Sequence, residues 1–213
     1  MIPFYSSSTL RGREFRSLTG SWTPDANATE SLITVEATDL PITVADAKKW
    51  LRVTHDKDDN NIEVLIQAVT LKIEQLIGRD LMVKTRKERW SKWSRFLYLS
   101  YYPVASVTSV SAVEDDGTTT ALTLGTDYYV QGLERKFIEL INSGNANYID
   151  VVYTSGASTA SSVPDKYKAA IFQELAAQYK NRQSSQDGTI AIVGDLTVQT
   201  RMLLQMDLIE NEL

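Results

Sequence analysis

The stretch DDNNIEVLIQAVTLKIEQLIGRDL (residues 58–81) carries the strongest structural signal in this chain of 213 residues. Its apolar residues recur at steps of three and four, which places them on one stripe of an α-helix. Gly78 is a natural end for that helix, because glycine adopts a positive φ without steric strain. We therefore predict a helix over residues 57–77 whose stripe faces the core: Ile62, Leu65, Ile66, Val69, Ile73, Leu76 and Ile77.

A shorter helix is predicted immediately upstream, over residues 43–53. Thr43 can cap its first turn, and Asp46 stands near the capping-box position. The two helices are joined by THDKDDN (residues 54–60), which holds the only histidine, His55. Acidic side chains favour the positive end of a helix dipole and accept hydrogen bonds from first-turn amides. We interpret three residues as helix-capping and not catalytic: Asp56, Asp58 and Asp59.

This acidic segment lacks the residues that a metal site or a catalytic site would require. A calcium loop starting at Asp56 needs glycine at its sixth position and an acid at its twelfth, where the chain has Asn61 and Gln67. The chain has no cysteine and no second histidine for a transition metal. A Ser-His-Asp triad could use only His55, and nucleotide-binding and hydrolase motifs are absent. We expect no enzyme activity, no metal and no cofactor.

Beyond residue 81 the apolar period becomes that of strands. Strands are predicted near residues 81–90, 95–100, 104–113, 121–124, 128–131, 136–141 and 148–153, with glycine turns at 114–119 and 142–147. A closing helix over residues 163–182 follows, with Ser162 as its N-cap and Pro164 in its first turn. Segregated blocks of this kind predict an α+β fold, in which an N-terminal helix pair and a closing C-terminal helix pack with a mainly antiparallel sheet.

The chain divides into three predicted regions. Residues 1–40 are an N-terminal arm or extension, which we interpret as an extended arm or a loosely packed strand. Residues 41–182 form the folded domain with its sheet at about 81–153, and residues 183–213 are a linker and a C-terminal arm. The last segment is either a helix that folds back on its own domain or an arm for a neighbour's groove, and its dense apolar residues favour the arm. The residues of this proposed partner-binding arm are Leu196, Val198, Met202, Leu203, Leu204, Met206, Leu208 and Ile209.

Composition narrows the classes of function. The net charge is −5, which argues against a protein that holds nucleic acid through its phosphates. No secretory signal or membrane-spanning run is apparent, and the absence of cysteine fits a reducing compartment. Clustered aromatic residues could form a sugar- or base-stacking platform, but such residues more often fill a sheet core. They are Trp90, Trp93, Phe96, Tyr98, Tyr101 and Tyr102.

Several stretches in order resemble the head–tail connector, or adaptor, proteins of long-tailed bacteriophages. ITVADAKKWLRVTHDKDDNNIEVLIQAVTLKIEQLIGRDL (residues 42–81) resembles the family's short helix, acidic loop and long helix that closes in a G-R-x-L corner. YYPVASVTSV (101–110) is similar to its P-V-x-S-V element, and VVYTSGAS (151–158) to its V-x-Y-x-A-G strand end. VPDKYKAAIFQELAAQYKNR (163–182) looks like its closing helix. The extension of 40 residues, Arg86 and the tail depart from the family pattern.

The resemblance implies a structural virion protein at the neck, assembled in the host cytoplasm. Family members form homo-oligomeric, usually twelve-fold rings beneath the portal protein, extend the DNA channel and provide a docking surface for a tail terminator or the next neck protein. DNA then passes through the channel without sequence-specific binding. The alternative from another class is a carbohydrate- or receptor-binding β-module of a tail or surface protein, with the aromatic cluster as its platform.

Overall fold

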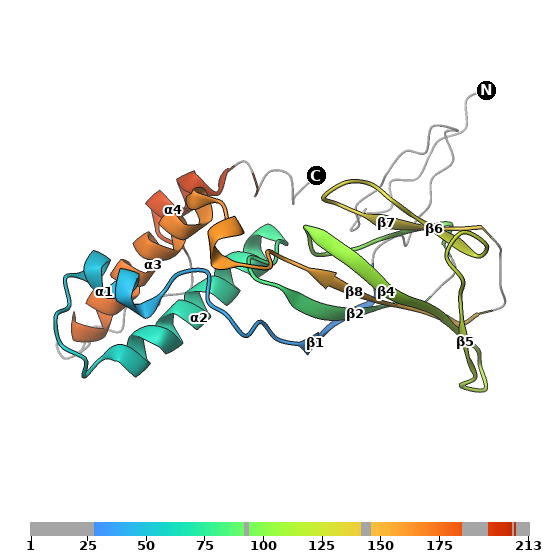
Figure 1. Ribbon diagram of the computed structural model, residues 1–213, viewed down its shortest axis with the longest axis horizontal. Coiled ribbons are helices and arrows are strands. Elements are labelled where there is room, and N and C mark those ends of the chain that lie inside the picture. The colour runs from blue at the N-terminus through green and yellow to red at the C-terminus, as the bar shows by residue number, and fades with distance from the viewer. Residues whose placement is uncertain (1–27, 92–93, 142–145, 185–195, 206, 208–213) are drawn as a thin grey trace, which may run out of the picture.

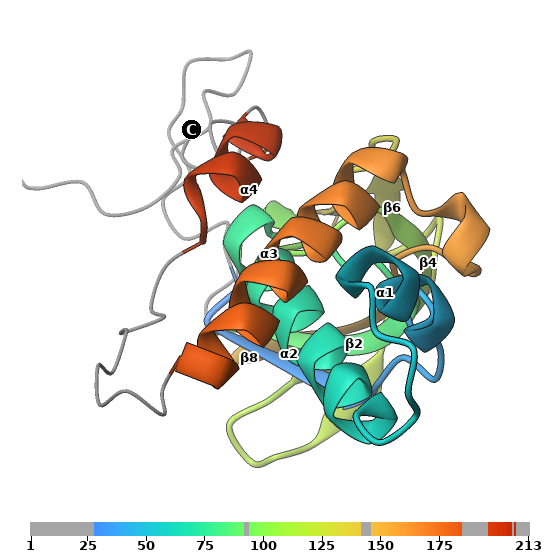
Figure 2. The same ribbon diagram turned by 90° about the vertical axis from the view of Figure 1, so that its left-hand side faces the viewer.

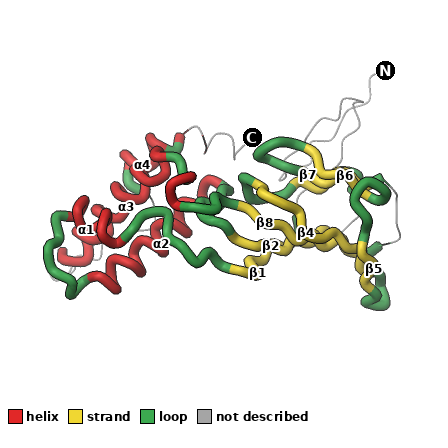
Figure 3. The backbone as a smooth tube through the Cα atoms, in the orientation of Figure 1, coloured by secondary structure: helices red, strands yellow, loops and turns green. Residues whose placement is uncertain are grey.

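The computed structural model describes residues 28–91, 94–141, 146–184, 196–205 and 207. Its helices gather at one end of an elongated molecule and its strands at the other (Figures 1 and 3). The helices are α1 (Val44–Leu51), α2 (Asp59–Ile77), α3 (Asp165–Ser184) and α4 (Val198–Leu203), with a 3-10 turn, η1 (Ala160–Ser162). The strands are β1 (Glu30–Val35), β2 (Lys84–Trp90), β3 (Phe96–Tyr98), β4 (Val104–Val113), β5 (Thr119–Ala121), β6 (Tyr128–Gln131), β7 (Phe137–Leu140) and β8 (Tyr148–Ser155). The predicted α+β class is confirmed.

Local signals in the sequence place the ends of the first two helices. The Thr43 hydroxyl accepts a hydrogen bond of 3.1 Å from the Asp46 amide at the start of α1. Gly78 ends α2 with φ at 62°, as the periodicity predicted. The closing helix differs at its start, because α3 begins at Asp165 and Ser162 belongs to η1. The prediction of Ser162 as its N-cap is therefore wrong.

The strands form two sheets where the sequence predicted one. The larger sheet has the order β1-β2-β8-β4-β5, the smaller has the order β3-β7-β6, and all their strand pairs are antiparallel. β1 lies at an edge of the larger sheet and pairs with β2 from Glu30–Arg89 to Val35–Thr85. The last part of the expected N-terminal arm, residues 30–35, is thus a strand of the domain.

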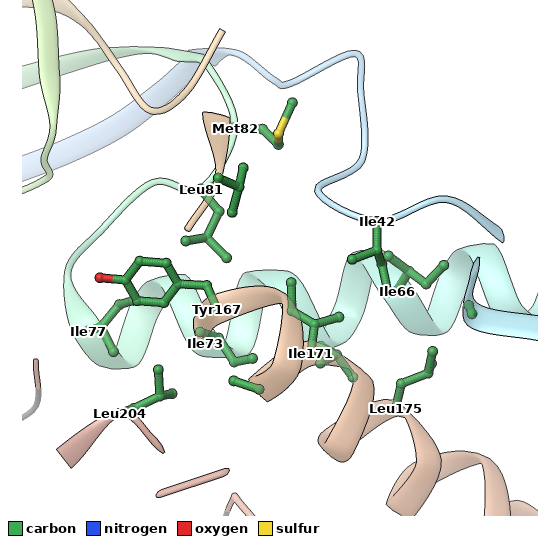
Figure 4. Close-up of a cluster of buried hydrophobic side chains, with 14 of the residues drawn as sticks. Ile42, Ile66, Ile73, Ile77, Leu81, Met82, Tyr167, Ile171, Leu175 and Leu204 are labelled. Atoms are coloured by element: carbon green, nitrogen blue, oxygen red, sulfur yellow. The ribbon is translucent and has the colours of Figure 1, made fainter. Parts of the chain in front are cut away.

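The helical end has its own core between α2 and α3. Ile66, Ile73 and Ile77 of α2 face Ile171 and Leu175 of α3 in Figure 4, and all five are fully buried. Viewed from the helical end, α3 crosses over α2, and α1 and α4 lie beside it (Figure 2). Burying each such side chain contributes roughly 1.5–3 kcal/mol, so this contact supplies much of the stability of the helical end.

A second core lies at the sheet end of the molecule. It includes Trp90, Leu97, Ile138, Val151 and Tyr153, each at most 1% exposed. These residues come from β2, β3, β7 and β8, so this core joins the two sheets. The helices and the sheets therefore each pack around a hydrophobic core of their own.

An ion-pair cluster on the surface of the larger sheet links β8 to β2. Asp150 of β8 accepts two hydrogen bonds from Arg89, at 2.6 and 2.8 Å, and forms an ion pair of 2.7 Å with Lys87. These hydrogen bonds, chiefly those from Arg89, hold the pKa of Asp150 below its ordinary value. Asp150 is itself buried, so its charge depends on both partners.

Replacing Asp150 with asparagine is expected to lower the free energy of unfolding by about 1–3 kcal/mol near neutral pH. A carboxyl whose pKa is lower in the folded state stabilises the fold above its unfolded pKa of about 3.9, and this contribution is lost as the pH falls through the folded pKa. Urea unfolding of both proteins between about pH 7 and pH 2.5 should show the difference shrinking toward acid. Glu139→Gln, on the exposed pair with Arg95, is the control and should change little. A difference that stays constant with pH would contradict this account.

Candidate docking surfaces

The acidic residues at the start of α2 contact α1 and α3. Lys48 of α1 lies 2.5 Å from Asp56 and 2.7 Å from Asp59. Asp58 is the N-cap residue, but its side chain makes no capping hydrogen bond and instead accepts one of 2.7 Å from the Tyr179 hydroxyl of α3. Asp58 and Asp59 thus stand at the start of α2, as the capping interpretation expects. Lys48 of α1 and Tyr179 of α3 also contact these residues and Asp56, and the local sequence reveals neither partner. The segment fastens three helices together.

The described residues offer no metal-ligating or membrane-spanning feature. No group of three or more histidine, cysteine, aspartate or glutamate side chains in this part of the chain could hold a metal ion. His55 is exposed in the loop between α1 and α2. Among the same residues, no helix is both long and apolar enough to cross a membrane.

The aromatic cluster does not form an open platform. Trp90 is 1% exposed and Tyr102 is 4% exposed, so neither ring face is available to a ligand. Phe96 and Tyr98 pack against Phe137, with ring centroids 5.9 and 5.3 Å apart. Two members of the cluster remain. The ring of Tyr101 is covered by the Arg86 guanidinium, and Trp93 lies outside the described residues. Most of this cluster is therefore packing within the sheets.

A buried charge cluster joins the end of α2 to the larger sheet. Arg86 of β2 makes two hydrogen bonds of 2.7 Å to the two carboxylate oxygens of Asp80. Asp80 also accepts a short hydrogen bond from the hydroxyl of Ser155 in β8. Next to this pair, Lys84 donates a hydrogen bond of 2.5 Å to Glu74 of α2. All five side chains are buried, so the helical and sheet ends are held together by paired charges.

The surroundings of these carboxyls affect their protonation. Burial raises the pKa of Glu74, although Lys84 opposes that change. Burial likewise raises the pKa of Glu88, whose carboxylate accepts hydrogen bonds from the Tyr153 hydroxyl at 2.8 Å and the Ser100 amide at 3.1 Å. Neither group is open to a substrate, so we assign them a structural role.

Sequence reasoning missed this cluster, although β2 contained a signal for it. The strand KTRKERW buries every second residue, and three of its buried positions are charged: Lys84, Arg86 and Glu88. Charged residues on both faces of a strand require partners on the buried face. That rule could have predicted buried ion pairs here, but not which residues form them.

The C-terminal segment folds back on its own domain. Leu196 is 6% exposed and Leu204 is fully buried, and both belong to the helical core with α2 and α3. Further contacts hold the segment: the Thr197 amide donates to Glu174 of α3 at 3.0 Å, and Asp207 accepts a hydrogen bond of 3.0 Å from the Tyr167 hydroxyl. Two of the residues predicted for the partner-binding arm, Leu196 and Leu204, therefore complete the core of the domain itself.

One face of α4 nevertheless remains open to a partner. Val198 and Met202 are 67% and 68% exposed, and their spacing of four residues places them on the same side of the helix. Leu203 is exposed beside them. Of the other residues predicted for the arm, Met206, Leu208 and Ile209 lie outside the described residues. We call Val198, Met202 and Leu203 the α4 face.

A model of the family described as "Head completion protein" matches residues 41–202, about three quarters of the chain. The chain belongs to the head completion protein family. The match includes the stretches that resemble phage connector proteins, and it reaches Val198 and Met202 of the α4 face. This head completion protein is thus a structural protein of the head–tail junction of a phage-like particle. Its residues 1–40 lie outside the matched region.

Solved structures similar to this head completion protein come from gene transfer agent (GTA) particles. A chain in the neck of the empty GTA particle, computed with C6 symmetry, is 18% identical with a TM-score of 0.67, over 84% of this chain and 95% of that one. A chain in the neck of the native GTA particle, computed with C12 symmetry, is 19% identical with a TM-score of 0.62, over 84% and 93%. At these identities the likeness establishes a shared fold. A comparison with curated proteins finds no significant sequence match.

Proposed function

We propose that this protein forms a twelve-fold ring at the virion neck, between the portal protein and the tail terminator or next neck protein. The observation that carries the proposal is membership of the head completion family over residues 41–202. The fold shared with chains from GTA necks, computed with C6 and C12 symmetry, supports a cyclic arrangement. The ring extends the DNA channel and gives the tail a surface on which to dock.

A cyclic ring requires heterologous contacts, in which one face of a subunit meets a different face of the next. The elongated shape of the molecule provides such faces, with helices at one end and sheets at the other (Figure 3). The charge cluster between the two ends makes the subunit a stiff unit, since Asp80, Arg86 and Ser155 are bonded across the junction. A stiff subunit can repeat one contact around a ring without losing its register.

The α4 face is the portal-binding surface in this proposal. Its two most exposed residues, Val198 and Met202, stand on a helix that is anchored through Leu204. A pre-anchored helix loses less conformational entropy on docking than a free arm would. Each contact is small, but repetition around the ring multiplies the attachment through avidity.

The charge of the protein suits a channel through which DNA slides. A net charge of −5 provides no excess of lysine and arginine for holding phosphates. The neutral or acidic surface of such a ring would let the duplex pass without sequence-specific binding. Assembly would take place in the host cytoplasm, where cysteine-free chains such as this one need no disulfides.

Changing Val198 and Met202 together to aspartate is expected to abolish binding to the portal while leaving the fold intact. Two charges on the α4 face cannot be desolvated against an apolar partner surface. The measurement is electron microscopy and co-sedimentation of the protein mixed with the portal of the same particle, with urea unfolding as the check on folding. Wild-type protein should form a symmetric ring on the portal.

The matched control is Leu133→Asp, which adds a charge at a residue that is 91% exposed between β6 and β7. This variant should bind the portal as wild type does. If the α4 double variant still assembled normally on the portal, the α4 face would not be the docking surface. Absence of any ring from both portal mixtures and intact particles would refute the proposed function itself.

A further inference from the structure

A hollow of about 370 Å³ lies between α2 and the segment 36–41 that connects β1 to α1. Its apolar wall consists of Ala37, Leu40, Pro41, Leu71 and Met82. Its floor is polar, with Thr70 and the buried Glu74–Lys84 pair. It lies outside the α4 face, and none of its contacts is needed for the proposed attachment to the portal.

The floor contains a polar atom that no described residue satisfies. Thr70 is 8% exposed, and its hydroxyl oxygen is buried without a hydrogen-bond partner among the described residues. Leaving such a group unpaired is unfavourable, because it has lost its hydrogen bonds to water. A rotation of the Thr70 side chain toward the hollow would let a ligand with hydrogen-bond donors satisfy this oxygen.

The rim of the hollow is acidic. Glu36, Asp39 and Glu63 line it, and all three are exposed. The only cation in the lining is Lys84, which is already paired with Glu74. An occupant that fits this site therefore combines positive charge for the rim, donors for Thr70 and apolar groups for the wall.

We propose that the hollow binds the segment LRGREFR, residues 10–16 of this same polypeptide. The segment carries Arg11, Arg13 and Arg16 against a single Glu14, although the whole chain has a net charge of −5. A guanidinium has five N–H donors, which can serve both a carboxylate and a hydroxyl. The segment also supplies Phe15 and Leu10 for the apolar wall.

The length of chain between the segment and the domain allows this contact. Residues 17–27 lie between Arg16 and Ala28, the first described residue, and an extended chain covers about 40 Å from one to the other. β1 begins at Glu30, which pairs with Arg89, and ends at Val35, which pairs with Thr85. The strand is about 20 Å long, and its second end is the one nearer to α2. The segment can therefore reach the hollow of its own subunit.

This contact would hold the N-terminal segment against the connection between β1 and α1. The segment lies within residues 1–40, outside the region that the family model matches. Residues 10–16 would cover this connection and join the N-terminal extension to the helical end of the domain. It is independent of the ring, because it concerns the hollow and the N-terminal segment alone.

Disulfide trapping in the full chain tests this proposal, because the protein has no cysteine of its own. The test variant carries Phe15→Cys with Leu71→Cys, and the matched control carries Phe15→Cys with Leu76→Cys. Leu71 and Leu76 are both exposed on α2, at 42% and 38%, but only Leu71 lines the hollow. In a glutathione redox buffer the Leu71 variant should form its disulfide about tenfold faster than the control.

The products are read on non-reducing gels and by peptide mass spectrometry. Linkage within one chain or between two chains supports the proposal, since both place the segment in the hollow. Adding Arg13→Glu and Arg16→Glu should remove most of the preference for Leu71, and high salt should reduce it. Equal linkage rates at Leu71 and Leu76, or a preference unaffected by the arginine changes, would overturn the proposal. The test needs no portal, so its failure would leave the proposed ring untouched.

Discussion

Replacing Arg86 with leucine is expected to lower the free energy of unfolding by about 3–5 kcal/mol, the typical cost of breaking a buried ion pair from one side. Arg86 is 4% exposed and makes both of its carboxylate hydrogen bonds to Asp80, at 2.7 Å each. Its removal leaves the Asp80 charge buried, with Ser155 as a neutral donor and Lys84 3.9 Å away. The Tyr101 ring also loses the guanidinium that covers it. The helical end and the larger sheet would then be joined by fewer bonds.

Denaturant unfolding, followed by circular dichroism, measures this loss. Arg95→Ala is the control, because Arg95 pairs with Glu139 on the surface and its side chain is 68% exposed. An exposed pair contributes at most about 1 kcal/mol. The double variant Asp80→Asn/Arg86→Leu should cost less than the sum of its single changes, since each single change leaves the other charge unpaired. Equal effects of Arg86→Leu and Arg95→Ala would show that the cluster adds no stability.

Replacing Leu204 with alanine is expected to cost about 2–5 kcal/mol of unfolding free energy, as large-to-small changes in a core do. Leu204 is fully buried and packs into the core formed by α2 and α3, near Tyr167 and Ile77 in Figure 4. The matched control is Leu203→Ala, one residue earlier, where the side chain is 38% exposed. That change should alter stability much less. Thermal and urea unfolding of the two variants give the comparison directly.

Because Leu196 and Leu204 are part of the core, a C-terminal truncation would test the stability of the domain as well as docking through α4. Deleting residues 196–213 removes Leu196 and Leu204 from the core and exposes the side of α3 that they cover. Such a truncation would destabilise the domain, so a loss of the proposed portal binding would not test the role of α4 in docking. Substitutions on the exposed α4 face separate the two effects. A truncated protein as stable as wild type would contradict the role assigned to these leucines.

Helix and strand identity could be predicted from the sequence because it follows from local periodicity. The stripe from Ile62 to Ile77 appears as α2, and its end at Gly78 is where the glycine predicted it. The strand near residues 104–113 appears as β4 with the same bounds, and that near 128–131 as β6. Side-chain spacing along a helix or a strand is fixed by backbone geometry, so these elements can be predicted without knowledge of their neighbours.

The candidate docking surfaces could be predicted only in part. The residues of the C-terminal segment were identified as apolar, but periodicity did not separate Leu204, which is buried, from Met202, which is exposed. The hollow beside α2 escaped prediction altogether, since its lining comes from three separate stretches of the chain. An apolar residue in the sequence indicates a buried or a docking surface equally, and only its neighbours distinguish them.

The sequence by itself determined the α+β composition, the order of the main helices and strands between residues 43 and 182, and the resemblance to phage connector proteins that the family match bears out. The tertiary structure alone decided that the strands divide into two sheets, that Asp56 and Asp59 pair with Lys48, and that Arg86 meets Asp80 inside the protein. The physical reason is the distance along the sequence over which each kind of interaction acts. Periodicity and capping act between residues a few positions apart, whereas the partner of a buried charge or an apolar face is whatever the completed fold brings next to it.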